Sequence, residues 1–386
     1  MLKTKVGYSQ NPDSYQSGAE SAKMALLGDA KVALLFTSVV MDQKDILDGV
    51  KSVADVPVLG CTSSAALCTQ DGYLNSETGY AGMMSFSGDL TVGVAASERK
   101  EDPRKVGQEL AREAMKKAGK KEAPSYFFMC CSPAEEEFYL KGIEDVIGRV
   151  PMFGGSAADN TVEGKWSIFC EDKVFTDGCA ICFFYTDSYM KNLYDGVYNE
   201  TSHAGVITKV SGARTLVEID HVPAVKKYAE WTGKKVDDLM GNNLLTESIF
   251  NPLGVKDPIG SITAIRHPMF ANDDLSMNIG ANLVENTAVI LMEGTTQSLI
   301  DANPKTIEKL DSLMEEEAQS YFLVHCGGRR LGIALNSEED KIYPAVKAVT
   351  GNKEFLMVFT FGEYGSSDHS ANTVGGLSLS FTGFGK

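Results

Sequence analysis

Two kinds of hydrophobic pattern alternate along the chain. The apolar run at 32–36 is typical of a buried strand, and a second short run at 56–59 leads into a turn at 60–63. Between the two runs, apolar residues recur at helical spacing, at Ile46, Leu47, Val50 and Val53. A helix-like stretch from Ser17 precedes the first run, and another strand is expected from near residue 82. The pattern therefore predicts a unit of helix, strand, helix, strand and strand.

The same order of elements returns in a second copy. Asp102 and Pro103 predict the N-cap and the first residue of a helix, and Ser132–Glu135 has the form of a capping box. Strands are expected at 126–130 and from residue 178. The first and second copies keep the same separation of 28 residues between strand start and glycine turn, Val32 to Gly60 and Tyr126 to Gly154. An equal spacing indicates that the two segments are repeats of one unit.

A third copy is expected near the end of the chain. Pro304 is predicted to open its first helix, and residues 320–326 match residues 125–131 at four of seven positions. A later helix would carry a buried stripe at Ile342, Val346 and Val349. The strand at 355–359 then reaches a turn at Gly362. The same unit is thus predicted three times.

This repetition predicts an α/β (α+β) fold of mixed sheets covered by helices, with an internally repeated α-β-α-β-β unit in two domains. We place the domains at 1–210 and 211–386. The segment from about 196 to 300 shows shorter strand-like runs, at 206–210, 215–219 and 288–291.

The glycine turns at the strand ends are the first candidates for a binding site. Glycine allows backbone N–H groups to approach a ligand closely, and successive N–H groups can cup an anion. Small polar side chains beside them would orient a small ligand. The candidates are Gly60, Cys61, Thr62 and Ser63 in the first copy, Gly154, Gly155, Ser156 and Asp159 in the second, and Gly362 and Glu363 in the third. The alternative is that these are simply tight turns.

The same junctions resemble the motifs of the FIST family. The family's N-terminal domain has a G-C-[ST] turn and an F-G-G-[ST]-A-x-D turn, which are similar to residues 60–63 and 153–159. Its C-terminal domain has C-x-G-R, G-E-[IY]-G and N-T motifs, which are similar to 326–329, 362–365 and 372–373. Between them, Pro223-Ala224-Val225 with Tyr228 resembles the family's P-A-x-x-x-Y segment. The matches run from about residue 30 to the end of the chain.

The resemblance implies a sensory protein that binds a small molecule, which would be an amino acid or a derivative. Arg266 and Arg329 would then hold a carboxylate, with Cys326 beside them, and Glu363 or Asp159 would hold an ammonium group. The alternative is that Arg329 and Glu363 pair with each other or lie in solvent. Many relatives carry a further output domain, so a separate signalling partner is expected here.

Composition narrows the classes of partner. A formal net charge of −16 disfavours nucleic acid and anionic membrane surfaces, which bind through Lys and Arg. Neither a signal peptide nor a membrane span is expected, so we expect a cytoplasmic protein with reduced thiols. Pairing of apolar edge strands would allow a homo-oligomer.

The hypotheses that the chain is an enzyme, binds a cofactor or binds a metal have weaker support in the sequence. The runner-up function is a thiol- or hydroxyl-dependent acyl transferase or hydrolase that uses Cys61 or Ser156 as the nucleophile. Cys179 and Cys182 lie three apart in a predicted strand, so their sulfurs would face opposite sides. No cofactor motif is present, and the histidines are scattered, at His203, His221, His267, His325 and His369. We therefore expect no cofactor and no metal.

Overall fold

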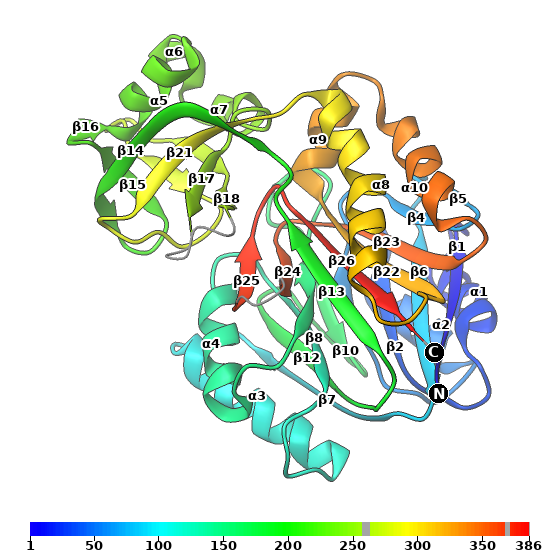
Figure 1. The fold of residues 1–386 in the computed structure, drawn as a ribbon. Coiled ribbons are helices and arrows are strands. Elements are labelled where there is room, and N and C mark those ends of the chain that lie inside the picture. Colours follow the sequence, from blue (N-terminus) through cyan, green and yellow to red (C-terminus); the bar gives the residue numbers. More distant parts are fainter. Residues whose placement is uncertain (257–262, 367–370, 386) are drawn as a thin grey trace.

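The computed structural model describes residues 1–256, 263–366 and 371–385. Three units of similar order follow one another along the chain, and a smaller domain is inserted in the third (Figure 1). Each unit runs strand, helix, strand, helix, strand, hairpin, strand. The first consists of β1 (Leu2–Ser9), α1 (Ser14–Ala25), β2 (Ala30–Thr37), α2 (Gln43–Lys51), β3 (Val58–Thr62), β4 (Leu67–Thr69), β5 (Gly72–Leu74) and β6 (Ala81–Gly88).

The second and third units repeat this order. The second consists of β7 (Thr91–Glu98), α3 (Pro103–Ala118), β8 (Tyr126–Cys131), α4 (Glu136–Ile147), β9 (Met152–Ser156), β10 (Ile168–Cys170), β11 (Lys173–Phe175) and β12 (Gly178–Tyr185). The third consists of β13 (Met190–Asp195), α8 (Thr296–Leu313), β22 (Ser320–Cys326), α9 (Gly327–Leu335), η1 (Glu339–Lys341), α10 (Ile342–Thr350), β23 (Glu354–Thr360), β24 (Glu363–Ser366), β25 (Asn372–Gly375) and β26 (Leu379–Phe384).

The three units exchange their hairpins in a cycle. Each sheet has four strands of its own unit and receives a hairpin from another unit. The three orders are β1-β6-β2-β3-β10-β11, β7-β12-β8-β9-β24-β25 and β13-β26-β22-β23-β4-β5. In each unit the first strand that follows a helix pairs in parallel with the next, as β2 does with β3, and the other pairings are antiparallel. These sheets are mixed and have helices beside them, which confirms the predicted fold class.

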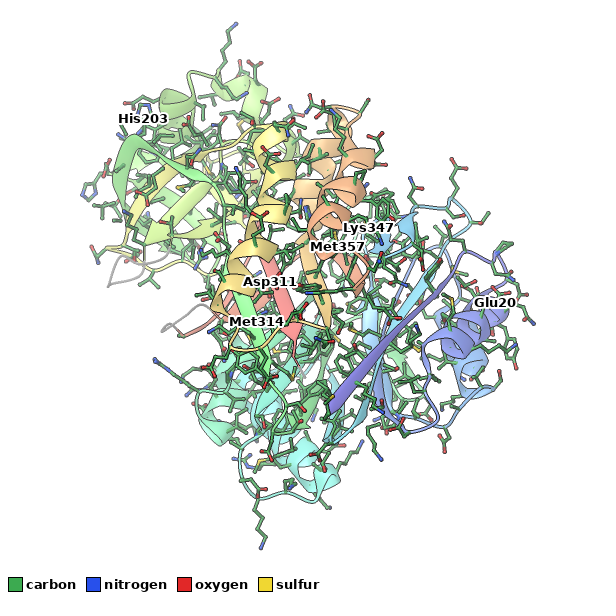
Figure 2. The ribbon with its side chains drawn as sticks, turned by 45° about the vertical axis from the view of Figure 1, so that its right-hand side comes forward. Glu20, His203, Asp311, Met314, Lys347 and Met357 are labelled. Carbon is green, nitrogen blue, oxygen red and sulfur yellow. The ribbon has the colours of Figure 1, made fainter. Side chains whose placement is uncertain are left out.

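One shared core fills the space between the inner faces of the three sheets. Phe36, Phe128 and Phe322, one from each unit, contact one another there with ring centroids 5.5–6.3 Å apart. Helix pairs cover the outer faces over separate apolar clusters. Figure 2 shows Asp311 of α8, Met314 directly after this helix and Lys347 of α10 on the outside of the third sheet. The aromatic contacts and the hairpin exchange make the three units one folded body.

The inserted domain occupies residues 199–293 and has its own sheet and core. The short strand-like runs predicted in this region are confirmed as β14, β15 and β21. Its elements are β14 (Asn199–Ser211), β15 (Thr215–Ile219), β16 (Val222–Pro223), α5 (Ala224–Thr232), α6 (Val236–Leu239), α7 (Asn243–Glu247), β17 (Leu253–Lys256), β18 (Thr263–Arg266), β19 (Pro268–Ala271), β20 (Met277–Ile279) and β21 (Ala288–Glu293). The proposed domain boundary at 210 and 211 lies at the end of β14, and the division into 1–210 and 211–386 stays a prediction.

The starts of α3 and α4 differ in how well the local sequence predicts them. Asp102 caps α3 by accepting a hydrogen bond from the N–H of Lys105 at 3.0 Å, as predicted. The predicted capping box at Ser132–Glu135 is wrong, because α4 begins at Glu136 without a side-chain cap. The hydroxyl of Ser132 instead accepts the N–H of Gly178 at 3.1 Å.

Pro304 lies inside α8, so its prediction as a helix start is also wrong. The helix begins at Thr296, where Thr295 and Ser298 form a capping box. Proline lacks the N–H that would reach the carbonyl of Ile300, and the side-chain amide of Asn303 donates to that oxygen at 3.0 Å instead. The packed helix therefore keeps the proline in its interior.

The sequence match between residues 125–131 and 320–326 is out of register with the sheets by one residue. Phe322 shares the inner core with Phe128, whereas Phe127 faces the opposite side, toward α3 and α4. A shift of one residue reverses every side chain in a strand. The third unit also places α9 before the predicted helix α10, an element that the sequence pattern did not reveal.

Gly60 and Gly154 allow neighbouring strands to approach closely. A Cβ atom at Gly60 would lie 1.8 Å from the carbonyl oxygen of Leu35, and one at Gly154 would lie 1.9 Å from that of Met129. Their φ angles are +158° and +142°. These glycines therefore serve the packing of strand on strand.

We expect Gly154→Ala to lower the free energy of unfolding by about 3 kcal/mol or more, because the added methyl group overlaps backbone. Gly28→Ala is the matched control, since a Cβ there meets nothing within 4 Å, and its effect should stay within about 0.5 kcal/mol. Urea denaturation of both variants tests this, and equal midpoints would contradict it.

Candidate functional site

The ends of three strands, one from each unit, meet in a ring of backbone hydrogen bonds. The N–H of Ser64 donates to the carbonyl of Phe359 at 2.8 Å. Ala158 donates to Thr62 at 2.9 Å, and Phe361 donates to Ser156 at 3.3 Å. Each unit thus donates to the next in a cycle. The corners that the sequence singled out lie together in the structure.

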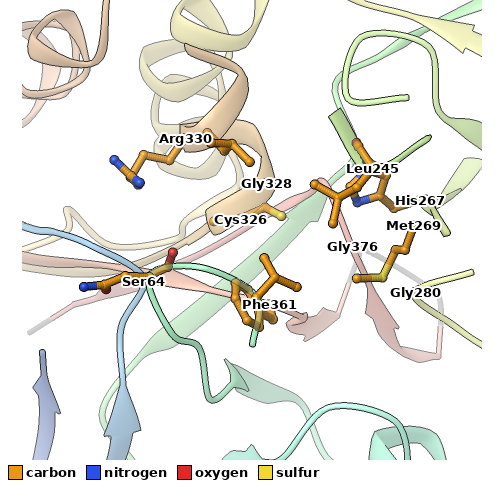
Figure 3. Close-up of a pocket in the computed structure, with 14 residues that line it drawn as sticks. Ser64, Leu245, His267, Met269, Gly280, Cys326, Gly328, Arg330, Phe361 and Gly376 are labelled. Atoms are coloured by element: carbon orange, nitrogen blue, oxygen red, sulfur yellow. Dashed lines mark hydrogen bonds between the residues drawn. The ribbon is translucent and has the colours of Figure 1, made fainter. Parts of the chain in front are cut away.

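A cavity lies beside this ring, between the core and the inserted domain (Figure 3). It offers about 60 Å³ to the centres of water-sized molecules, which corresponds to roughly four to six such molecules. The core lines it with Ser64, Asn160, Cys326, Gly328, Arg330 and Phe361, and the inserted domain with Leu245, His267, Met269 and Gly280. The cavity therefore has walls from both parts of the molecule.

Cys326 and Glu363 form the polar end of this region. Cys326 is the N-cap of α9, and its sulfur accepts the N–H of Leu377 at 3.2 Å. The carboxyl of Glu363 accepts the N–H of Ser378 at 3.0 Å and the hydroxyl of Thr360 at 3.1 Å. Burial raises the pKa of Glu363 to about 8, and burial with the nearby carboxyl raises the pKa of the Cys326 thiol. The adjacent N–H groups of Leu377 and Ser378 therefore hold the side chains of Cys326 and Glu363 next to each other.

Leu377 has a φ of +54°, in the left-handed region that side chains other than glycine rarely adopt. This conformation directs the N–H groups of residues 377 and 378 toward the sulfur and the carboxyl. Local strain of this kind persists only where the surroundings hold it, and it is frequent at functional sites.

His267 faces the start of α9 across the cavity. Its Nε2 lies 3.0 Å from the carbonyl oxygen of Leu245, which makes Nε2 the protonated nitrogen. Burial lowers the pKa of His267 to about 4, so the ring is neutral at pH 7. It lies in the break between β18 and β19.

Arg330 is a positively charged residue that lines the cavity on the side of the core. Its Nη1 binds Glu339 at 2.6 Å, while its buried Nε has no partner among the described residues. The stem of the side chain lines the cavity, and in Figure 3 the guanidinium lies above Ser64.

Most predicted corner residues are structural. Cys61 is fully buried in the shared core, Thr62 binds the N–H of Ser167, and the hydroxyl of Ser63 joins Ala66 to Phe359. Gly155 and Gly362 pack tightly against Thr360 and Ser156. None of these residues lines the cavity.

Ser156 belongs to a buried network that crosses to the inserted domain. Its hydroxyl donates to Glu136 at 2.8 Å and lies 2.5 Å from the hydroxyl of Tyr364. Glu136 and Glu137 both pair with Arg214 of the inserted domain. Burial raises the pKa of Glu136, and Arg214 opposes this rise. Neither Ser156 nor Cys61 is placed to meet a substrate in the cavity.

Asp159 organises the loop that follows β9. Its carboxylate accepts four backbone N–H groups, from Thr161, Val162, Glu163 and Lys165. Its acceptors are used within the loop, so it does not offer them to an ammonium group. The adjacent Asn160 and Val162 line the cavity in its place.

The two predicted arginines lie apart from each other and from the cavity. Arg266 donates to the carbonyls of Asn282 and Ile265, beside a separate surface pocket near α4. Arg329 is completely buried, donates to the carbonyl of Leu299 in α8 at 3.0 Å and stacks on Tyr198. Arg329 and Glu363 form no ion pair in the described residues, so neither predicted arrangement of this pair is present.

Of the predicted site residues, only Cys326 lines the cavity, and Glu363 lies directly behind it. Sequence reasoning missed Ser64, Asn160, His267, Arg330 and Phe361 as cavity residues. Two successive glycines after a strand, Gly327 and Gly328, were the available signal, because such a pair often opens a helix near a ligand.

Comparison with known families agrees with these motifs. The FIST N domain matches residues 31–222, and the FIST C domain matches residues 224–366. The chain belongs to the FIST family. FIST domains are associated with ligand binding in sensory signal transduction. The resemblance drawn from the sequence motifs is confirmed.

Other comparisons add little. No curated protein matches the chain. Solved structures with some similarity include cyanuric acid hydrolase from A. caulinodans, at 8% identity, a TM-score of 0.36 and full coverage of both chains. PurLQS from Thermotoga maritima has 8% identity and a TM-score of 0.22 over 99% of this chain and 72% of that one. At these TM-scores neither likeness bears on fold or function.

Two kinds of feature are absent from the described residues. No helix there has the length and apolar character to cross a membrane. No cluster of three His, Cys, Asp or Glu side chains is arranged to hold a metal ion within 1–256, 263–366 and 371–385. His369 lies outside the described residues.

We expect Arg329→Ala to lower the free energy of unfolding by about 2–4 kcal/mol, since it removes a buried hydrogen bond and leaves a void beside α8. Arg112→Ala, at an exposed position of α3, is the control and should change stability by less than about 0.5 kcal/mol. Matching unfolding curves for the two variants would be inconsistent with the buried hydrogen bond.

The raised pKa of Glu363 predicts a pH dependence of stability. The folded chain holds a proton on this carboxyl up to about pH 8, whereas the unfolded chain releases it near its usual pKa. The stabilisation from the neutral carboxyl is therefore lost as pH rises from about 4.5 to about 8, at no more than about 1.4 kcal/mol per pH unit. Glu363→Gln should lack this loss. Urea unfolding of both proteins at pH 5, 6, 7 and 8 tests it, and parallel stability curves would refute it.

Proposed function

We propose that the chain is a sensory protein that binds a small metabolite in the cavity between α9 and the inserted domain. The observation that carries this proposal is that one cavity is bounded by strand ends of the core on one side and by Leu245, His267 and Met269 on the other. A ligand there would contact the core and the inserted domain through one site. Sensing requires that kind of differential contact.

The walls favour a short ligand with one polar end. Leu245, Met269 and Phe361 give an apolar surface, while Ser64 and the first turn of α9 give hydroxyl and N–H groups. The start of a helix favours negative charge, so a carboxylate is the suitable polar end. A small amino acid or related acid fits this description. A larger ligand would require the inserted domain to move outward.

The inserted domain provides a route from the cavity to a distant contact. Gly280 lines the cavity, and its carbonyl accepts a hydrogen bond from Arg214 at 3.3 Å. Arg214 in turn pairs with Glu136 and Glu137 at the start of α4. Displacement of Gly280 by a ligand would therefore bear directly on this ion-pair cluster. A separate signalling partner would recognise the resulting position of the domain.

The test is a thermal-shift screen with glycine, alanine, acetate and pyruvate. A true ligand should raise the unfolding temperature by an amount that grows with its concentration over its dissociation constant. Leu245→Trp should abolish the shift because the larger ring fills the cavity. Leu335→Trp, at an exposed position of α9, is the matched control and should keep it. An equal shift in both variants, or none of these compounds shifting the unmodified protein, would count against the proposal.

A further inference from the structure

A thiol and a carboxyl lie together where the cavity meets α9. The sulfur of Cys326 points toward the space between Phe361 and Leu245 in Figure 3. The carboxyl of Glu363 lies beside this thiol, because the adjacent N–H groups of Leu377 and Ser378 donate to the sulfur and to the carboxyl respectively. We propose that Cys326 is a nucleophile that captures a small aldehyde in the cavity, with Glu363 carrying the proton. This rests on the proposed function only in that the cavity must admit a small molecule.

Burial and the nearby carboxyl raise the pKa of the Cys326 thiol, and the surrounding backbone acts in the opposite direction, toward the thiolate. The N–H of Leu377 donates to the sulfur at 3.2 Å, and the N–H groups of Gly328 and Arg329 also favour its charged form. Two of these belong to the first turn of α9, where the helix dipole also favours negative charge. Cys326 is the sole thiol among the residues that line this cavity. Cys61, by contrast, is packed in the apolar core and has no such donors in the described structure.

Glu363 has the properties of a proton carrier for this thiol. Its pKa of about 8 lies close to the working pH, which is where a general base is effective. The thiol and the carboxyl lie side by side, so the proton on one affects the titration of the other. Hydrogen bonds from Thr360 and Ser378 fix both of its oxygens. The other titratable groups that act on it are Cys326, Arg329, Tyr194 and Tyr198.

The chemical step balances without a further reactant. The Glu363 carboxylate takes the proton of the Cys326 thiol, and the sulfur lone pair forms a bond to the carbonyl carbon. The π pair of the carbonyl moves onto its oxygen, which takes a proton from a water molecule in the cavity, and the proton held by Glu363 returns to solvent, so that the water is restored. The product is a hemithioacetal, in which every atom of the aldehyde is kept. Because nothing leaves, the reverse reaction releases the aldehyde and restores the thiol.

The cavity favours an aldehyde over an ester. It is small, and its apolar wall of Leu245, Met269 and Phe361 suits a short alkyl chain. The neutral His267 ring uses its Nε2 proton on the carbonyl of Leu245, so it has no proton to give to a leaving group. An addition that needs no leaving-group acid fits this arrangement.

The direct test uses propanal labelled with ¹³C at its carbonyl carbon. In NMR spectra of the full chain we expect a new signal of a saturated carbon bonded to sulfur and oxygen, which disappears after dialysis. Cys326→Ala should lack this signal while keeping its thermal unfolding temperature. Absence of the signal in the unmodified protein overturns the proposal, as does its persistence in Cys326→Ala.

A second experiment measures the thiol itself. Iodoacetamide should label Cys326 in the native protein at a rate that rises with pH and levels off above about 8, and propanal should slow this labelling. Cys61, mapped in the same digest, should stay unlabelled because it is packed in the shared core and does not line the cavity. Glu363→Gln should slow labelling of Cys326 at pH 8 by about tenfold or more and remove the pH step.

The two proposals fail differently. Thermal shifts with the short acids but no propanal signal would remove the nucleophile and leave the sensing function in place. An unchanged pH profile of labelling in Glu363→Gln would remove the role of the carboxyl. If neither the acids nor propanal acts on the protein, both proposals fail.

Discussion

The rest of the structure depends on a cyclic exchange of backbone pairing among three units. No unit completes its own sheet, because the hairpin of each unit pairs with the sheet of a second unit, and its own sheet is completed by the hairpin of the third. The strand ends repeat the cycle through Ser64 to Phe359, Ala158 to Thr62 and Phe361 to Ser156. Unpaired strand edges are prone to association, and the received hairpins cover the edges of β3, β9 and β23 within one chain. The same closure brings strand ends from distant parts of the sequence to one point.

The candidate site lies where the third unit departs from the other two. Position 60 in the first unit and 154 in the second are glycines, whereas the third unit has Met357 opposite Leu323 in the same place. The third unit also adds α9 directly after β22 and accommodates the inserted domain between β13 and α8. The first turn of α9 and the inserted domain then enclose the cavity. The elements shared by the three units form the three sheets, and the features particular to the third unit form the cavity.

Buried carboxyls in this protein have two different roles, which their partners decide. Glu136 lies against Arg214 and the hydroxyl of Ser156, so its charge is compensated and it ties the core to the inserted domain. Glu363 has hydroxyl, thiol and N–H partners but no ion pair in the described structure, so burial dominates and keeps its proton near pH 7. Arg329 is a third buried charge, which supports α8 near its internal proline. Only Glu363 is left poised to exchange a proton beside a cavity.

The sequence by itself determined the repeated unit, the fold class and the family, because these follow from the alternation of apolar runs with helical stripes and from short ordered motifs. It also located Cys326 and Glu363. Only the tertiary structure decided the strand register, the hairpin exchange and the cavity, because each depends on pairing between residues far apart in the chain. The match of 320–326 to 125–131 failed by one residue since core packing, and not local identity, sets which face of a strand is buried. Asp159 and Arg329 show the same limit: their charges suggested ligand contacts, and the fold uses them for its own backbone.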